Sequence, residues 1–119
     1  MMADKPATPP RLTIAAGEVV LALDCLDLLA PGGPLPLPGT IHRGYGEIDA
    51  ALLAGLQPER IILPLFASGY DAMSAIEALQ RLGYAGLITV VAPELPRPRL
   101  VERELRAAGP GQRLSLITL

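Results

Sequence analysis

The sequence predicts an α/β fold in which helices cover a parallel sheet, and two observations carry this prediction. The first is a series of short, continuous apolar runs, which are typical of strands buried on both faces of a parallel sheet. The second is helical periodicity between these runs, so that strands and helices alternate along the chain. A helix between two strands returns the chain so that the strands run parallel, and right-handed crossovers place the helices on the faces of the sheet.

The first half of the chain contains one clear strand. Residues 19–23 form an apolar run that ends at Asp24 and is predicted to be a buried strand. The apolar residues before it, 12–16, either pair with it as a hairpin or stay outside the sheet. With four prolines and five glycines, residues 31–46 are predicted to form a long loop. A short helix is predicted to follow this loop and to stop at Pro58.

The second half of the chain alternates more regularly. Apolar runs predict strands at residues 60–66, 87–91 and 114–119. A helix is predicted between the first two, with apolar side chains at Met73, Ile76, Leu79 and Leu82. Ser68 and Asp71 are candidate caps for its first turn. A second amphipathic helix is predicted at residues 100–108. This order of elements predicts a flavodoxin-like three-layer sandwich.

Length and composition limit the functions that the chain can have. Its 119 residues suit one domain, predicted at residues 12–119 after a proline-rich, disordered lead-in at residues 1–11. A net charge of -2 gives no basic surface, so we expect no nucleic-acid partner. No apolar run approaches the length of a membrane span, and residues 1–11 have no apolar stretch typical of a signal peptide, so we expect a cytoplasmic protein without a membrane partner.

Within residues 61–93, an apolar run reaches Pro64, and Ser68-Gly69-Tyr70-Asp71 then opens the next predicted helix. This segment resembles the middle of a response-regulator receiver domain. In that family a buried strand ends at a phosphoacceptor aspartate, and a turn ending Pro-Gly-hydrophobic-Asp-Gly then opens the next helix. Gly69 and Asp71 fall on the turn residues of this frame, and Ser68 replaces the proline. Upstream, Asp24 follows the first predicted strand, where the family has a metal-binding acid.

The chemistry that this resemblance implies is lost at several positions. Pro64 stands at the degenerate phosphoacceptor position and has no carboxylate. Ala92 stands at the degenerate hydroxyl position after the next strand, and the family's lysine has no counterpart, because Lys5 is the only lysine. Phosphoryl transfer depends on charge placed around the phosphate. The resemblance therefore indicates a degenerate receiver, or pseudo-receiver, that is not an enzyme and holds no metal or cofactor.

The chain is also short for this family, whose fifth strand is followed by a helix. We therefore expect a sandwich shortened at its C-terminus, with an apolar face of the last strand left uncovered. The residues predicted for this dimer or partner face are Leu114, Leu116 and Leu119. Exposed apolar surface of this kind marks an interaction site, so we expect a homodimer or a partner protein in signalling of the bacterial type.

A second candidate site is the crevice at the carboxyl ends of the strands, where α/β folds bind their ligands. Its predicted residues are Asp24, Pro64, Phe66, Ser68, Tyr70, Ala92 and Pro93. Two hypotheses follow. The first is a non-catalytic pseudo-receiver that docks onto a protein partner, independently of phosphorylation. The alternative is a sensor module that binds a small ligand in this crevice.

Several residues with reactive or charged side chains have both a functional and a purely structural interpretation. Asp24 is either a ligand contact or a solvated acid at a strand end. Cys25 is either a redox-sensitive thiol or a small buried side chain, and the second is favoured because no lysine or histidine is adjacent. His42 is either a pH-sensitive group or a loop residue. The arginines of the helix at residues 100–108 are either a patch for an acidic partner or are balanced by neighbouring glutamates.

Overall fold

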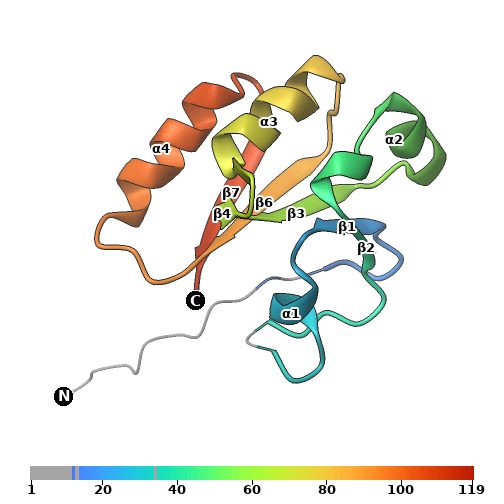
Figure 1. Cartoon of the computed structure of the whole chain (residues 1–119), viewed down its shortest axis with the longest axis horizontal. Helices are drawn as coiled ribbons and strands as arrows, with labels where there is room; N and C mark the ends of the chain where they lie inside the picture. The colour runs from blue at the N-terminus through green and yellow to red at the C-terminus, as the bar shows by residue number, and fades with distance from the viewer. Residues whose placement is uncertain (1–11, 13, 34) are drawn as a thin grey trace.

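The computed structural model describes residue 12, residues 14–33 and residues 35–119, and the predicted lead-in at residues 1–11 lies outside these. The described part is an α/β fold around a five-stranded parallel sheet (Figure 1). The strands are β1 (Val20–Leu23), β2 (Ile41–Arg43), β3 (Arg60–Pro64), β6 (Leu87–Ala92) and β7 (Arg113–Thr118). Their order, β2-β1-β3-β6-β7, is that of a flavodoxin-like sandwich, as the sequence predicts.

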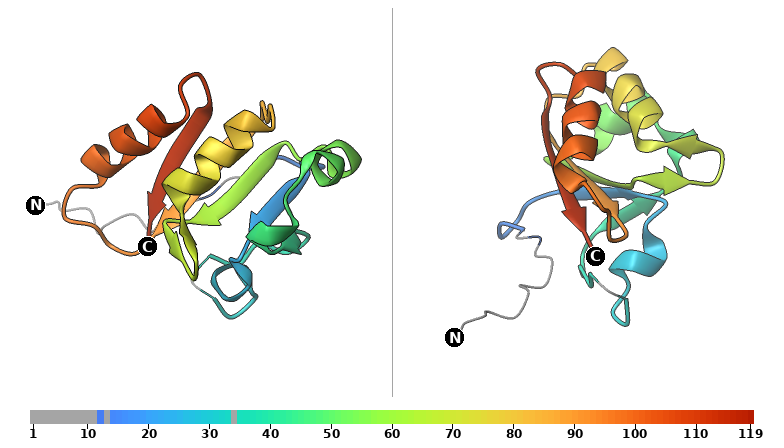
Figure 2. Two further views of the ribbon diagram at one scale, coloured as in Figure 1. Left: turned by 45° about the horizontal axis from the view of Figure 1, so that its top comes forward. Right: turned by 90° about the vertical axis from the view of Figure 1, so that its left-hand side faces the viewer.

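Helices lie on both sides of the sheet, but unequally. Figure 2 shows α3 (Ala72–Arg81) and α4 (Pro98–Ala108) on one side and the single turn of α1 (Leu26–Leu29) on the other. The short α2 (Ala50–Leu56) follows β2 and a 3-10 turn, η1 (Tyr45–Glu47). No helix in the described part of the chain is long and apolar enough to cross a membrane.

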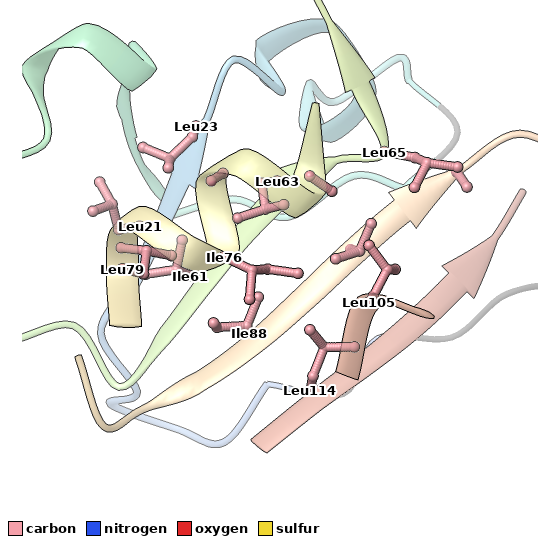
Figure 3. Close-up of a cluster of buried hydrophobic side chains, with 14 residues drawn as sticks. Leu21, Leu23, Ile61, Leu63, Leu65, Ile76, Leu79, Ile88, Leu105 and Leu114 are labelled. Atoms are coloured by element: carbon pink, nitrogen blue, oxygen red, sulfur yellow. The ribbon is translucent and has the colours of Figure 1, made fainter. Parts of the chain in front are cut away.

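The larger core lies between the sheet and the helices α3 and α4 (Figure 3). Ile61 and Leu63 of β3 point to this side, whereas Ile62 belongs to a second cluster on the α1 side. All three side chains are fully buried, which explains why β3 is a continuous apolar run rather than an alternating one. On the other side the loop residue Leu35 supplements α1, and its amide donates to the Leu28 carbonyl.

Two expectations about local structure were wrong. The predicted loop at residues 31–46 contains β2, which the glycines and prolines around it conceal. The predicted strand at residues 60–66 ends at Pro64, and the chain then turns into a small antiparallel hairpin of β4 (Phe66–Ala67) and β5 (Tyr70–Asp71). Gly69, with φ of +90°, provides the left-handed turn. Asp71 caps α3 by accepting from the Ser74 amide, whereas Ser68 lies exposed in the turn.

The predicted partner face on the last strand also needs correction. Leu114 is buried in the core under α3 and α4, and Leu116 packs against the same core. Only Leu119 of the three is exposed. On the opposite face of the sheet, a polar row crosses the strands: Arg60 donates to Thr89, whose hydroxyl contacts that of Ser115 at 3.4 Å. Leu114 and Leu116 lie two residues apart on the face that packs into this core, so the three leucines do not form one open apolar face.

Candidate functional site

Asp24 lies where the sequence places it, at the carboxyl end of β1. β1 and β2 are parallel neighbours with Leu23 opposite Arg43, so both strands end at the same edge of the sheet. The chain turns there, with Asp24 in the left-handed region at φ of +54° and its amide bonded to the Arg43 carbonyl. This register brings Asp24 beside Tyr45, which opens η1.

Two tyrosines engage the Asp24 carboxylate. Its Oδ2 accepts a hydrogen bond of 2.7 Å from the Tyr70 hydroxyl and one of 3.1 Å from the Tyr45 amide. The two rings are stacked, with centroids 4.2 Å apart and planes inclined by 17°. Burial and the hydrogen bond to Asp24 raise the pKa of the Tyr70 hydroxyl well above its usual value. We call Asp24, Tyr45 and Tyr70 the tyrosine latch.

Three other predicted crevice residues, Pro64, Ala92 and Pro93, have apolar side chains and take no part in the hydrogen bonds of the tyrosine latch. Pro64 is buried in β3 opposite Val91, and Ala92 is buried at the end of β6, where its carbonyl accepts from the Leu119 amide. Pro93 is exposed beyond the strand. Between the latch and β6, the edge of the sheet is therefore built from apolar side chains.

Phe66 belongs to a different surface, on the other side of the hairpin. Because Phe66 pairs with Asp71 and Ala67 pairs with Tyr70, the alternation along the hairpin sends Phe66 and Tyr70 to opposite faces. Phe66 is 71 % exposed and lines a groove of about 190 Å³ between the hairpin, α3 and α4. We call this the apolar groove; its lining residues are Leu65, Phe66, Asp71, Ala72, Met73, Leu95, Val101, Glu104 and Leu105.

Both charged residues that line the apolar groove are acidic, namely Asp71 and Glu104. The amide and hydroxyl of Ser74 donate to Asp71 Oδ1 and lower the pKa of that carboxyl, which is therefore ionised at neutral pH. Among the basic residues of α4, Arg106 is engaged by Glu102 at 3.0 Å and by the Leu114 carbonyl. The groove is thus apolar in its lining, and the two charged side chains that line it are both acidic.

A second hollow, of about 260 Å³, lies beside the latch between β1 and β2. Its lining includes Asp24, Cys25, His42 and Glu47. Burial and the Asp24 charge raise the pKa of the Cys25 thiol to about 12, so the thiol is protonated at neutral pH. Nδ1 of His42 is buried without a hydrogen-bond partner within the described ranges. No group of three or more histidine, cysteine, aspartate or glutamate side chains suited to a metal ion occurs among the described residues.

The structure brings together only part of the predicted crevice. Asp24 and Tyr70 meet in the latch, whereas Phe66 lies in the groove and Ser68 lies in the hairpin turn. Sequence reasoning missed Tyr45, whose contact with Asp24 depends on the unpredicted β2. It also assigned Met73 to the core, although this side chain is 41 % exposed and lines the groove.

Comparison with protein-family models, with curated proteins and with solved structures found no match for this chain.

Proposed function

We propose that the chain is a non-catalytic, receiver-like module that acts by binding a partner protein, independently of phosphorylation. The observation that carries this proposal is the apolar groove, where the large side chains of Phe66 and Met73 are exposed together. Exposed apolar side chains that line one depression favour an interaction site over a catalytic one. In this proposal the module works in the cytoplasm and in signalling of the bacterial type.

The chemistry at the strand ends supports a role without phosphoryl transfer. Pro64 and Ala92 offer neither a carboxylate nor a hydroxyl. The remaining acid, Asp24, accepts hydrogen bonds from the Tyr70 hydroxyl and the Tyr45 amide. We expect no labelling of the chain by acetyl phosphate and Mg²⁺, as measured by intact mass; labelling of Asp24 or Asp27 would contradict this part of the proposal.

Site-specific photo-crosslinking in the producing cells tests the contact itself. A photoreactive phenylalanine analogue at Phe66 is expected to crosslink to a protein, because this side chain is exposed in the groove. The matched control is the same analogue at Leu26, which is 62 % exposed but lies on α1. Discrete adducts at position 66 and none at position 26 support the proposal. Equal crosslinking at both positions, or none at either, contradicts it.

A homodimer stays a prediction of the sequence. Leu114 and Leu116 cannot form its interface, because Leu114 is buried in the core and Leu116 packs against it. The test is the native mass from light scattering at tens of micromolar protein. A mass twice that of the chain supports a dimer, and the mass of one chain contradicts it.

The hollow beside the latch, at about 260 Å³, favours a second candidate function, the binding of a polar ligand smaller than those that usual small-molecule pockets take. His42 lines this hollow together with Asp24 and Glu47, so polar side chains from several segments are available to a ligand there. A metabolite panel that raises the melting temperature of the wild type, but not of His42→Phe, supports this function. A panel without any such shift contradicts it.

A further inference from the structure

The size of the apolar groove indicates what kind of occupant it takes. Pockets for small molecules commonly measure about 300–1,000 Å³, and this groove measures about 190 Å³. It therefore suits one or two large side chains of a polypeptide better than a whole ligand. Its floor is formed by Leu65, Ala72 and Leu105, which are buried and fixed in the core.

The walls of the groove favour side-chain contacts. Val101 and Leu105 are four residues apart on α4, and Met73 lies in the first turn of α3. The backbone amides and carbonyls in the middle of these helices are already hydrogen-bonded within the helix. A partner therefore cannot pair with them as an added strand and contacts side chains instead. Grooves between helices receive the apolar face of an amphipathic helix.

The hairpin holds Phe66 in place at the mouth of the groove. Its Tyr70 is fixed to Asp24 by the 2.7 Å hydrogen bond and to Tyr45 by stacking, while the Ala72 amide donates to the Leu65 carbonyl. An exposed aromatic side chain on a held backbone is pre-organised for binding, because little conformational freedom is lost on contact. Phe66 is therefore the expected anchor of the interface.

The charge of the groove selects among partners. Asp71 and Glu104 are its two charged lining residues, and both are negative. Asp71 caps α3, so the positive end of the helix dipole offsets part of its charge. Glu104 is exposed on α4 and supplies the remaining carboxylate. A partner with lysine or arginine beside its apolar residues complements this pattern, and a partner with acidic residues there is repelled.

From this combination we propose that the apolar groove receives a basic amphipathic helix of a partner protein, with Phe66 as anchor and Glu104 as the residue that selects basic partners. This inference rests on the proposed function, since it names the chemistry of the partner that binds there.

The test measures binding to the full chain by fluorescence anisotropy. Three peptides share one length and one apolar helical face, and their polar positions carry lysine, serine or glutamate. We expect the lysine peptide to bind most tightly and its affinity to fall as salt rises. Phe66→Ala is expected to weaken binding about tenfold or more, and Glu104→Lys about fivefold with a smaller dependence on salt.

Two matched variants control for general effects. Leu26→Ala removes an exposed apolar side chain outside the groove, and Glu77→Lys reverses an exposed charge on α3 outside the groove. Both are expected to bind like the wild type. Circular dichroism shows whether each variant is folded. We expect Phe66→Ala and Glu104→Lys to fold, because both side chains are exposed.

The outcomes separate this inference from the proposed function. Equal binding of the serine or glutamate peptide, an unchanged affinity of Glu104→Lys, or no binding of any peptide overturns the inference. If crosslinking at position 66 is nevertheless specific, the contact function stands and only the basic partner is wrong. If crosslinking at position 66 fails as well, both are wrong.

Discussion

Removing the Tyr70 hydroxyl tests the tyrosine latch with the smallest change that the chain allows. Tyr70→Phe deletes the donor of the 2.7 Å hydrogen bond to Asp24 but keeps the ring that stacks on Tyr45. The Asp24 carboxylate keeps the Tyr45 amide as a donor and stays accessible to water. The variant therefore isolates one charge-assisted hydrogen bond.

The expected cost follows from the setting of this bond. Hydrogen bonds to charged groups contribute about 1.5–3 kcal/mol in buried sites. Asp24 is exposed and Tyr70 is only half-buried, so solvent reduces the expected loss to about 1 kcal/mol. For a domain of this size, that loss lowers the melting temperature by about 3–6 °C.

A double-mutant cycle with Asp24→Asn supplies the assay and the refutation. Asparagine tolerates the left-handed backbone of this position, so the second change removes charge without new strain. Urea unfolding of the wild type, both single variants and the double variant gives the coupling free energy, which we expect to be about 1 kcal/mol. A coupling free energy near zero would refute the latch as a stabilising contact.

Three further results are expected from other parts of the molecule. Glu18→Gln is expected to cost about 1–3 kcal/mol, because it removes the charge from the 2.8 Å Glu18–Arg60 pair, whose side chains are only 9 % and 13 % exposed, while Arg60 keeps its bond to Thr89; urea unfolding checks this cost. Burial works to raise the pKa of Glu18, but the hydrogen bonds from Arg60 and from the Ala15 amide bring it below 4.5. The stability that the Glu18–Arg60 pair contributes is therefore present above pH 4.5 and is lost as the pH drops through the folded pKa. In Glu18→Gln, the free energy of unfolding is expected to fall less over this range. The Cys25 thiol is expected to resist iodoacetamide at pH 8 until the protein unfolds, as followed by mass. Leu79→Ala is expected to cost about 2–5 kcal/mol by urea unfolding, because the side chain is fully buried in the main core.

Each of these expectations has a result that contradicts it. An unchanged acid limb of the stability profile in Glu18→Gln would mean that Arg60 is equally well satisfied without the carboxylate. Rapid alkylation of native Cys25 would mean that the thiol is neither buried nor protonated at pH 8. A loss below about 1 kcal/mol for Leu79→Ala would mean that the core around it is loosely packed.

The sheet was predictable from sequence where burial on both faces leaves a continuous apolar run. β3 and β6 are such strands, and their alternating side chains fill the core on each side. β2 is an edge strand of three half-buried or exposed residues, so it leaves no such run. The sequence could not show which face of β7 is buried. Alternation predicts that Leu114 and Ser115 point to opposite faces, but it does not show which face α4 covers.

The site was predictable only at single positions. A carboxylate that follows an apolar run indicates the carboxyl end of a strand, and this pattern placed Asp24 correctly at the end of β1. Its contacts with Tyr45 and Tyr70 join residues 21 and 46 positions away, and they depend on the register of β2 and on the hairpin. The two faces of that hairpin separate the latch from the groove, which no local pattern in the sequence indicates.

The most direct test of the groove as the partner-binding surface is amide chemical-shift mapping by NMR with the lysine peptide. We expect the shifts to gather around the groove, at residues 65–73 and 95–105, with smaller changes at the latch through the hairpin. With Phe66→Ala, the same shifts are expected to require about tenfold more peptide or more. Shifts centred on the hollow beside Asp24 and His42, or no shifts at all, would contradict the groove as the binding surface.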